Sequence, residues 1–150
     1  MKNSYSNDVC YSQLFLNAGI NTNSYGLDAD AIERSFGVNW LDHYYALNLL
    51  YSLLRSTSKR PGAPAPRIVF EGSEMHRWAP KETKFNSIKD VNDQKLSLVE
   101  LYGRTKLAMI LAAKFCLARG VIARNGDHIY ALSVHPAAVS LIYAKQLTSV

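Results

Sequence analysis

The chain has 150 residues, of which 48% are hydrophobic and 19% charged, and its formal net charge is +5. This length and composition fit a single globular domain with its own core, and they exclude a disordered or fibrous chain. The basic residues are dispersed and do not alternate with aromatic ones, so we expect a solvated basic surface and no nucleic-acid partner. The polar N-terminus and the short apolar runs predict neither a signal peptide nor a transmembrane segment, which favours a cytoplasmic protein.

The first predicted elements are a buried strand and a long helix. The run Leu-Phe-Leu at 14–16 ends in Asn-Ala-Gly, a pattern typical of a strand covered on both faces of a parallel sheet. Turn-forming residues fill 21–28. Apolar residues at three- and four-residue spacing then predict a helix over 29–56, with Asp28 or Asp30 as its cap.

The second half of the chain continues the alternation of strands and helices. Its predicted elements are a proline-rich break at 58–66, a strand at 67–73, a long irregular loop at 74–96, a helix from about Ser97 to Arg119 and a strand at 128–136. Residues 137–150 give no secondary-structure prediction. Strands that alternate with helices predict an α/β fold with a parallel sheet and right-handed crossovers.

Two residues of the second helix form a candidate acid–base pair. Tyr102 and Lys106 are four positions apart, so both side chains lie on one face of the helix. An ammonium beside a phenol favours the phenolate, and we therefore expect Lys106 to lower the pKa of Tyr102. Ser73 ends the second strand, where α/β folds place ligand-binding groups. Asn39 is a poor helix former inside the first helix, which indicates a special role.

The cysteines and histidines do not predict a metal site. His43, His76 and His135 have no metal-ligand arrangement, and Cys10 and Cys116 show no ligand spacing. We interpret both cysteines as free thiols of a reducing compartment rather than a disulfide pair.

Five segments, in this order, carry a family resemblance: LNAGI (16–20), FGVNWLDHY (36–44), RIVFEGSEMH (67–76), YGRTK (102–106) and SVHPAAV (133–139). Together they resemble the central and C-terminal part of a short-chain dehydrogenase/reductase, especially the retinol-dehydrogenase-like and WW-domain-oxidoreductase-like members of fungal type. The resemblance covers residues from about 13 to 140. It implies a partial Rossmann-like, doubly wound parallel sheet with three strands and two long helices. It also implies an NAD(P)-dependent oxidoreductase acting on a small, lipophilic carbonyl or alcohol.

The resemblance assigns a role to each candidate residue. Tyr102 would exchange a proton with the substrate oxygen, and Lys106 would bind the nicotinamide ribose. Ser73 would hydrogen-bond the substrate oxygen, and Asn39 would hold a water of the proton relay. The implied cofactor-binding residues are Asn17, Ala18, Gly19, Tyr102, Lys106, Pro136 and Val139. NADP is favoured over NAD as the cofactor, and no metal is expected.

The sequence also departs from the family pattern. No two glycines lie two or four positions apart, so the family's GxxxGxG turn is absent from this sequence. We therefore interpret residues 1–150 as a partial NAD(P)-binding domain without the first βαβ unit, and we expect the 150-residue chain alone to be inactive. Ala137 replaces a glycine of the family, and Leu141 stands at a threonine position.

These departures leave an alternative open. The chain would then be a catalytically inactive truncated paralogue, or a gene-model fragment, acting at most as an interaction protein. In the family's strand order, the strand at 14–16 would pair with a strand that this sequence does not contain. An unpaired parallel strand is an aggregation hazard, so we expect a marginal monomer or self-association through the exposed sheet edge.

Overall fold

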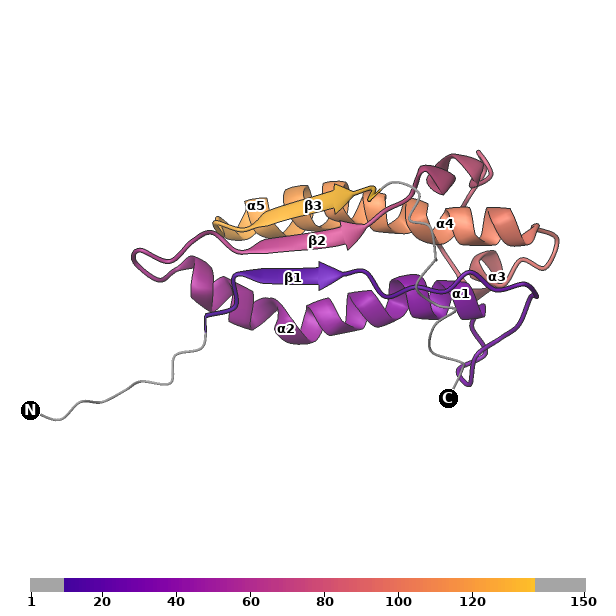
Figure 1. The fold of residues 1–150 in the computed structure, drawn as a ribbon, viewed down its shortest axis with the longest axis horizontal. Helices are drawn as coiled ribbons and strands as arrows, with labels where there is room; N and C mark the ends of the chain where they lie inside the picture. The colour runs from indigo at the N-terminus through magenta and orange to yellow at the C-terminus, as the bar shows by residue number, and fades with distance from the viewer. Residues whose placement is uncertain (1–9, 137–150) are drawn as a thin grey trace, which may run out of the picture.

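Three short parallel strands form the sheet (Figure 1). The structure, a computed structural model, describes residues 10–136. Its strands are β1 (Gln13–Leu16), β2 (Arg67–Glu71) and β3 (Tyr130–Val134), in the spatial order β1-β2-β3 with both pairings parallel. The predicted strands, the parallel sheet and the partial Rossmann-like α/β class are confirmed.

The first long helix is a run of three segments, α1 (Arg34–Phe36), the π-helical η1 (Gly37–Leu41) and α2 (Asp42–Ser58). It begins at Arg34 and not at residue 29, so the predicted start and caps are wrong. The Asp28 carboxylate accepts hydrogen bonds from two amides of a turn that precedes the helix, one of them the amide of Asp30. Glu33 is the cap instead, because its carboxylate accepts from two amides of the first turn at 2.9 Å.

The second long helix joins α4 (Leu98–Leu111), the π-helical η3 (Ala112–Ile122) and α5 (Ala123–Asn125). Its start matches the prediction, since Ser97 and Glu100 form a capping box. Its end lies at Asn125, beyond the predicted Arg119, where Gly126 adopts a left-handed conformation with φ of 62°. Within residues 10–136, no helix is both long and apolar enough to cross a membrane.

The segment 74–96, predicted as an irregular loop, contains two short helices. These are the 3₁₀ helix η2 (Glu74–Trp78) and α3 (Ile88–Val91). Each begins after a serine, Ser73 or Ser87, whose hydroxyl accepts a hydrogen bond from an amide of the first turn. The first backbone amides of a helix have no hydrogen-bond acceptor within the helix. The serine hydroxyl accepts from one of them and so determines where each helix starts.

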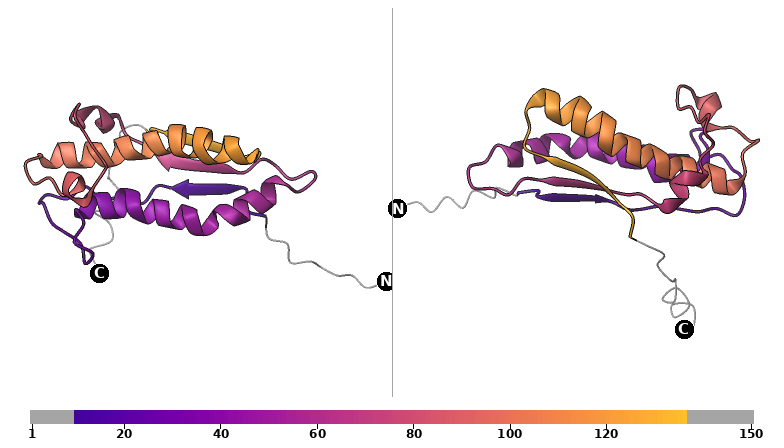
Figure 2. Two further views of the ribbon diagram at one scale, coloured as in Figure 1. Left: turned by 180° about the vertical axis from the view of Figure 1, so that it is seen from behind. Right: turned by 90° about the horizontal axis from the view of Figure 1, so that it is seen from above.

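Both long helices pack on the same face of the sheet (Figure 2). Alternate strand residues point towards them, including Leu16 of β1 and the fully buried Ile68 and Phe70 of β2. The main core cluster adds residues of both helices and of the segment before β3: Leu47, Leu54, Met109, Ala112, Ala113, Leu117, Ile122 and Ile129. This core holds the carboxyl ends of the three strands in one plane.

The opposite face of the sheet carries apolar side chains that no described helix covers. Phe15, Val69 and Leu132 form one row across the three strands, because they are register partners. Phe15 is 61% exposed and Leu132 is 41% exposed. The prediction that the first strand is buried on both faces is therefore wrong for Phe15 within residues 10–136. β1 is an edge strand of the described sheet, as the sequence predicts.

Candidate active site

Four parts of the fold converge on the ammonium group of Lys106. This side chain is 2% exposed, and its Nζ donates a hydrogen bond to the carbonyl of Glu71, the last residue of β2, at 2.8 Å. Gly19, in the loop after β1, passes close by, since a Cβ built on it would lie 3.8 Å from that Nζ. The same Cβ would lie 3.3 Å from the Oδ1 of Asn39 in η1. The pair on α4 thus faces the carboxyl ends of β1 and β2, where α/β folds bind ligands.

The side chain of Asn39 connects the loop after β1 to α4 through hydrogen bonds. Asn39 is fully buried, and its Oδ1 accepts from the amide of Ile20 at 2.7 Å. Its Nδ2 donates to the carbonyl of Ile20 at 2.9 Å and to the Oγ1 of Thr105 at 3.2 Å. The side-chain amide of Asn39 therefore has a structural role, which explains why an asparagine stands inside this helix. Asn39 also lies in a π-helical turn, and such turns are common at functional sites.

The main-chain carbonyl of Asn39 has a separate partner. It lies 3.0 Å from the Nδ1 of the buried His43, which must carry a proton there to donate to a carbonyl. Burial lowers the pKa of His43, and the positive charge of Lys106 lowers it further, against opposing contributions from the Asn39 carbonyl and nearby carboxylates. His43 is therefore neutral at neutral pH.

Tyr102 and Lys106 lie on one face of α4, with the Nζ 5.6 Å from the centre of the phenol ring. The expected electrostatic effect is not found. Burial raises the pKa of Tyr102 above its ordinary value, and the negative charge of Glu71 raises it further. Burial also lowers the pKa of Lys106, which Glu71 partly offsets. The expectation is therefore wrong, because burial and the charge of Glu71 set the direction of the pKa shift of Tyr102.

Ser73 follows β2 and begins η2. Its Oγ accepts from the amide of Met75 at 3.2 Å, and its carbonyl lies 2.7 Å from the Nδ1 of His76. Ser73 lines an open cavity of about 240 Å³ together with residues from the ends of β2 and β3: Gly72, Glu74, His76, Ile110, Ser133, Val134 and His135. The sequence has glycine where the family commonly has serine at 72, and a Cβ there would lie 2.9 Å from the Oγ of Ser133.

Close packing brings η2 onto the helix that carries Tyr102. A Cβ built on Gly103 would lie 2.7 Å from the carbonyl oxygen of Met75 and 2.9 Å from the amide nitrogen of Ala79. Only glycine permits this approach, because both contacts are with backbone. The segment that begins at Ser73 therefore lies directly against α4 beside Tyr102. Sequence analysis missed Gly103, although a glycine inside a strong helix pattern is a signal of close approach.

The expected cofactor-binding residues lie at the same edge of the sheet. Asn17, Ala18 and Gly19 are exposed directly after β1, and Pro136 is exposed after β3. Val139 lies outside the described residues, as do Ala137 and Leu141. In the part of the chain that the structure describes, no group of three His, Cys, Asp or Glu residues is placed to hold a metal ion.

Known proteins similar to this chain are reductases and dehydrogenases. No protein-family model matches the chain. A short-chain dehydrogenase/reductase of Aspergillus calidoustus is 31% identical over 137 residues, which covers 87% of this chain and 42% of that protein. Retinol dehydrogenase 14 of Mus musculus is 33% identical over 126 residues, which covers 84% of this chain and 34% of that protein. The chain spans less than half the length of these relatives.

A solved structure shares the fold. An uncharacterized protein from Mycobacterium paratuberculosis superposes with a TM-score of 0.66 at 26% sequence identity, covering 91% of this chain and 46% of that one. The sequence relatives and the shared fold thus agree with a partial Rossmann-like α/β fold. The chain belongs to the short-chain dehydrogenase/reductase family, on its retinol-dehydrogenase-like side.

Proposed function

We propose that this chain supplies the acid–base half of an NAD(P)-dependent oxidoreductase that interconverts a carbonyl and an alcohol. The observation that carries the proposal is the convergence of Gly19, Glu71 and Tyr102 on the Lys106 ammonium. A buried lysine held at the carboxyl ends of two parallel strands, with no carboxylate of residues 10–136 in ion-pair contact, is costly unless it serves a ligand.

The residues present fit the ribose of a nicotinamide cofactor. Lys106 uses one of its three N–H donors on the Glu71 carbonyl and lies beside the exposed loop at 17–19. Donors therefore remain for ribose hydroxyls. When bound, the cofactor supplies the hydride. Its binding residues, in this proposal, are Asn17, Ala18, Gly19, Tyr102, Lys106, Pro136 and Val139.

The chain's own residues would handle the proton. Tyr102 donates its phenolic proton to the carbonyl oxygen, and Ser73 donates a hydrogen bond to the same oxygen. The raised pKa keeps Tyr102 protonated at neutral pH, which suits the reducing direction. In this proposal a water held by Asn39 would return a proton through Lys106.

The substrate proposed is a small lipophilic carbonyl or alcohol, because the mouse relative is named for retinol. NADP is proposed ahead of NAD, and titration with both reduced cofactors decides between them. Residues 1–150 are proposed as a partial NAD(P)-binding domain, so the chain alone is expected to show no turnover.

One observation favours a second candidate, an interaction protein without activity. The exposed apolar side chains of Phe15 and Leu132, on either side of the buried Val69, give such a protein a surface for a partner. The two candidates differ in whether Lys106 serves a ligand.

NMR titration of the 150-residue chain with NADPH tests the function. We expect weak, saturable shifts of the Gly19 and Glu71 amides, lost in Lys106→Met and retained in Tyr102→Phe, which keeps the ribose donor of Lys106. Asn48→Ala, an exposed change on α2, is the control for non-specific shifts. Shifts that persist in Lys106→Met, or no shifts at these amides in the wild type, would overturn the proposal and leave the interaction protein.

A further inference from the structure

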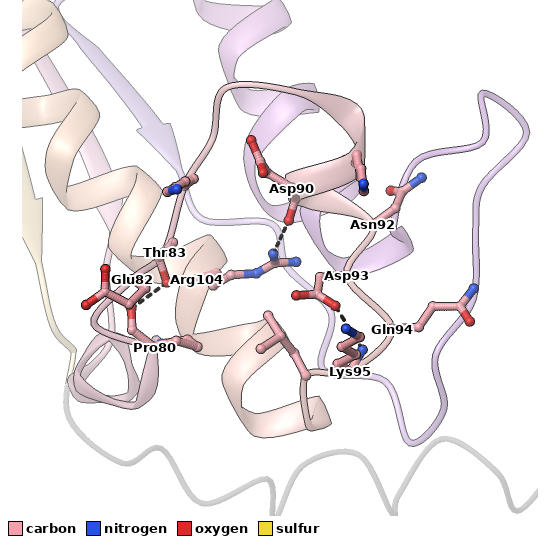
Figure 3. A pocket seen from close by; sticks show the side chains of 12 residues that line it. Pro80, Glu82, Thr83, Asp90, Asn92, Asp93, Gln94, Lys95 and Arg104 are labelled. Atoms are coloured by element: carbon pink, nitrogen blue, oxygen red, sulfur yellow. Dashed lines mark hydrogen bonds between the residues drawn. The ribbon is translucent and has the colours of Figure 1, made fainter.

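A second cavity lies beside the catalytic helix, on another side from Tyr102. It has a volume of about 630 Å³ and is bounded by the segment 80–96 and by Arg104 of α4 (Figure 3). Arg104 is two positions after Tyr102, which places the two side chains about 200° apart around the helix at 3.6 residues per turn. Tyr102, Ser73 and Lys106 do not line this cavity. It is therefore separate from the candidate active site.

The guanidinium of Arg104 is buried without a counter-ion in contact. Arg104 is 2% exposed, and its Nη1 and Nη2 donate to the main-chain carbonyls of Asp90 at 2.5 Å and Val91 at 2.6 Å. Its Nε has no hydrogen-bond partner, and no carboxylate within residues 10–136 forms an ion pair with it. Carbonyl dipoles do not neutralise a full charge, and a buried cation with no anion in contact is destabilising.

Burial lowers the pKa of Arg104, while more distant carboxylates, Glu33 first among them, act to raise it. Glu33 itself caps α1 through both carboxylate oxygens. No hydrogen bond or ion pair joins Glu33 to the guanidinium among the described residues. The positive charge of Arg104 is compensated only at longer range.

The rim of the cavity adds three lysines, Lys84, Lys89 and Lys95. None of them forms an ion pair with another residue of the part that the structure describes. Three acidic residues also line the cavity, and one of them, Glu82, is exposed and forms no ion pair with a described residue. Of the other two, Asp90 accepts from the amide of Asn86 at 3.1 Å and Asp93 accepts from the amide of Lys95 at 3.0 Å. These two carboxylates are turned to the backbone of their own loop.

We propose that this cavity binds the oxyanion group of a small molecule, a carboxylate or a phosphate, between the Arg104 guanidinium and the three rim lysines. Arg104 reaches from α4 into the middle of the lining residues, as Figure 3 shows. Two of the guanidinium's five N–H groups bind carbonyls, so donors remain for an oxyanion. Occupancy would join the 80–96 segment to the helix that carries Tyr102 and so stabilise both.

Titration at constant ionic strength tests the site, with inorganic phosphate, malonate and chloride as the three probes. The readouts are the Nε–H resonance of Arg104 and the thermal midpoint of the chain. We expect a saturable shift and a raised midpoint with phosphate or malonate beyond the response to chloride. A response to phosphate alone identifies a phosphate-bearing ligand, and a response to malonate alone identifies a carboxylate.

Exposed rim residues keep the test independent of folding. The double variant Lys89→Gln, Lys95→Gln is expected to weaken oxyanion binding about fivefold, since each exposed charge contributes a fraction of a kcal/mol. Lys81→Gln is the matched control, because Lys81 is exposed in the same loop but does not line the cavity. Equal responses to all three salts, or binding that the double variant leaves unchanged, would overturn the proposal. None of these readouts requires a nicotinamide cofactor, so the result is independent of the proposed function.

Discussion

At the scale of single residues, three buried polar side chains join the long helices to other segments of the fold. Lys106, Asn39 and Arg104 are all at most 2% exposed, yet each is polar or charged. The three are connected to different backbone segments: Lys106 to the end of β2, Asn39 to the loop after β1, and Arg104 to α3. Each therefore couples one of the long helices to a loop at the ligand-binding edge or beside it.

Asn39→Leu is expected to lower the free energy of unfolding by about 2–4 kcal/mol, because it leaves the buried amide and carbonyl of Ile20 without partners. Urea denaturation measures this loss. The control Asn48→Ala, at an exposed position of α2, should change stability by less than about 0.5 kcal/mol. Equal effects of the two substitutions would contradict the clamping role of Asn39.

At the scale of elements, the sequence predicts helices and strands correctly where hydrophobic periodicity is strong. It predicts the ends of elements wrongly where one side chain has several possible hydrogen-bond partners nearby. The three strands follow from local apolar runs, and the start of α4 follows from the local motif of Ser97 and Glu100. Neither depends on how distant parts of the chain pack. The start of the first helix does not follow from such a motif, because Asp28 and Asp30 are the caps expected from the sequence, and only the folded turn shows that Glu33 accepts from the first amides of the helix. Likewise, a glycine at 103 signals close approach, but only the fold identifies η2 as the neighbour.

Gly103→Ala tests the contact between η2 and α4. Alanine normally stabilises a helix interior by about 1 kcal/mol relative to glycine. Here its Cβ would meet backbone atoms at 2.7 and 2.9 Å, so we expect a net loss of about 1–3 kcal/mol and a displaced Ser73 segment. Urea denaturation and the amide shift of Ser73 measure both effects. Gly120→Ala, in the same helical run with its nearest contact at 3.2 Å, should cost less, and a larger loss there would refute the argument.

A buried carboxylate links α2 to the turn before β3 and predicts a dependence of stability on pH. The carboxylate of Asp127 accepts from the Tyr51 hydroxyl at 2.9 Å and from the Arg55 Nε at 3.0 Å. Burial acts to raise the pKa of Asp127, but these hydrogen bonds and the charge of Arg55 outweigh it, and the net shift is downward. Burial and Asp127 together raise the pKa of Tyr51 to about 12, so Tyr51 remains a donor.

Since the folded-state pKa of Asp127 lies below the unfolded value of about 3.9, its contribution is complete above that pH and is lost as the pH falls through the folded pKa. The difference in unfolding free energy between wild type and Asp127→Asn should therefore be constant from about pH 6 to 5 and shrink below about pH 4. Urea denaturation across this range measures it. A difference that stays the same at low pH would show that the carboxylate's charge does not matter.

At the scale of the whole molecule, the described fold has two layers where a parallel sheet ordinarily has three. Helices cover one face, and the apolar row on the other face lies open within residues 10–136. β1 also presents one unpaired edge in the described sheet. Both features supply the surface for self-association, which stays a prediction.

The double variant Phe15→Lys, Leu132→Lys should reduce association, because charges on the open sheet face oppose its burial. Sedimentation velocity over a range of concentrations measures the change. Tyr45→Lys, at a position 65% exposed on α2, is the control for added charge. A wild-type chain that is already monomeric and unfolds cooperatively at low concentration would contradict the prediction.

Because of the π-helical turn at η1, the structure of this region depends more on the number of residues in the turn than on which residue stands at position 38. The amide of Asp42 bonds the carbonyl of Gly37, five residues back, so the turn holds one residue more than an α-helix needs. Removing Val38, a half-buried residue, would close the turn to α-helical geometry and shift Asn39 relative to α1. Glu33 and Asn39 could then no longer both keep their partners. Among natural variants of this chain, substitutions at position 38 should therefore be common and single-residue deletions rare.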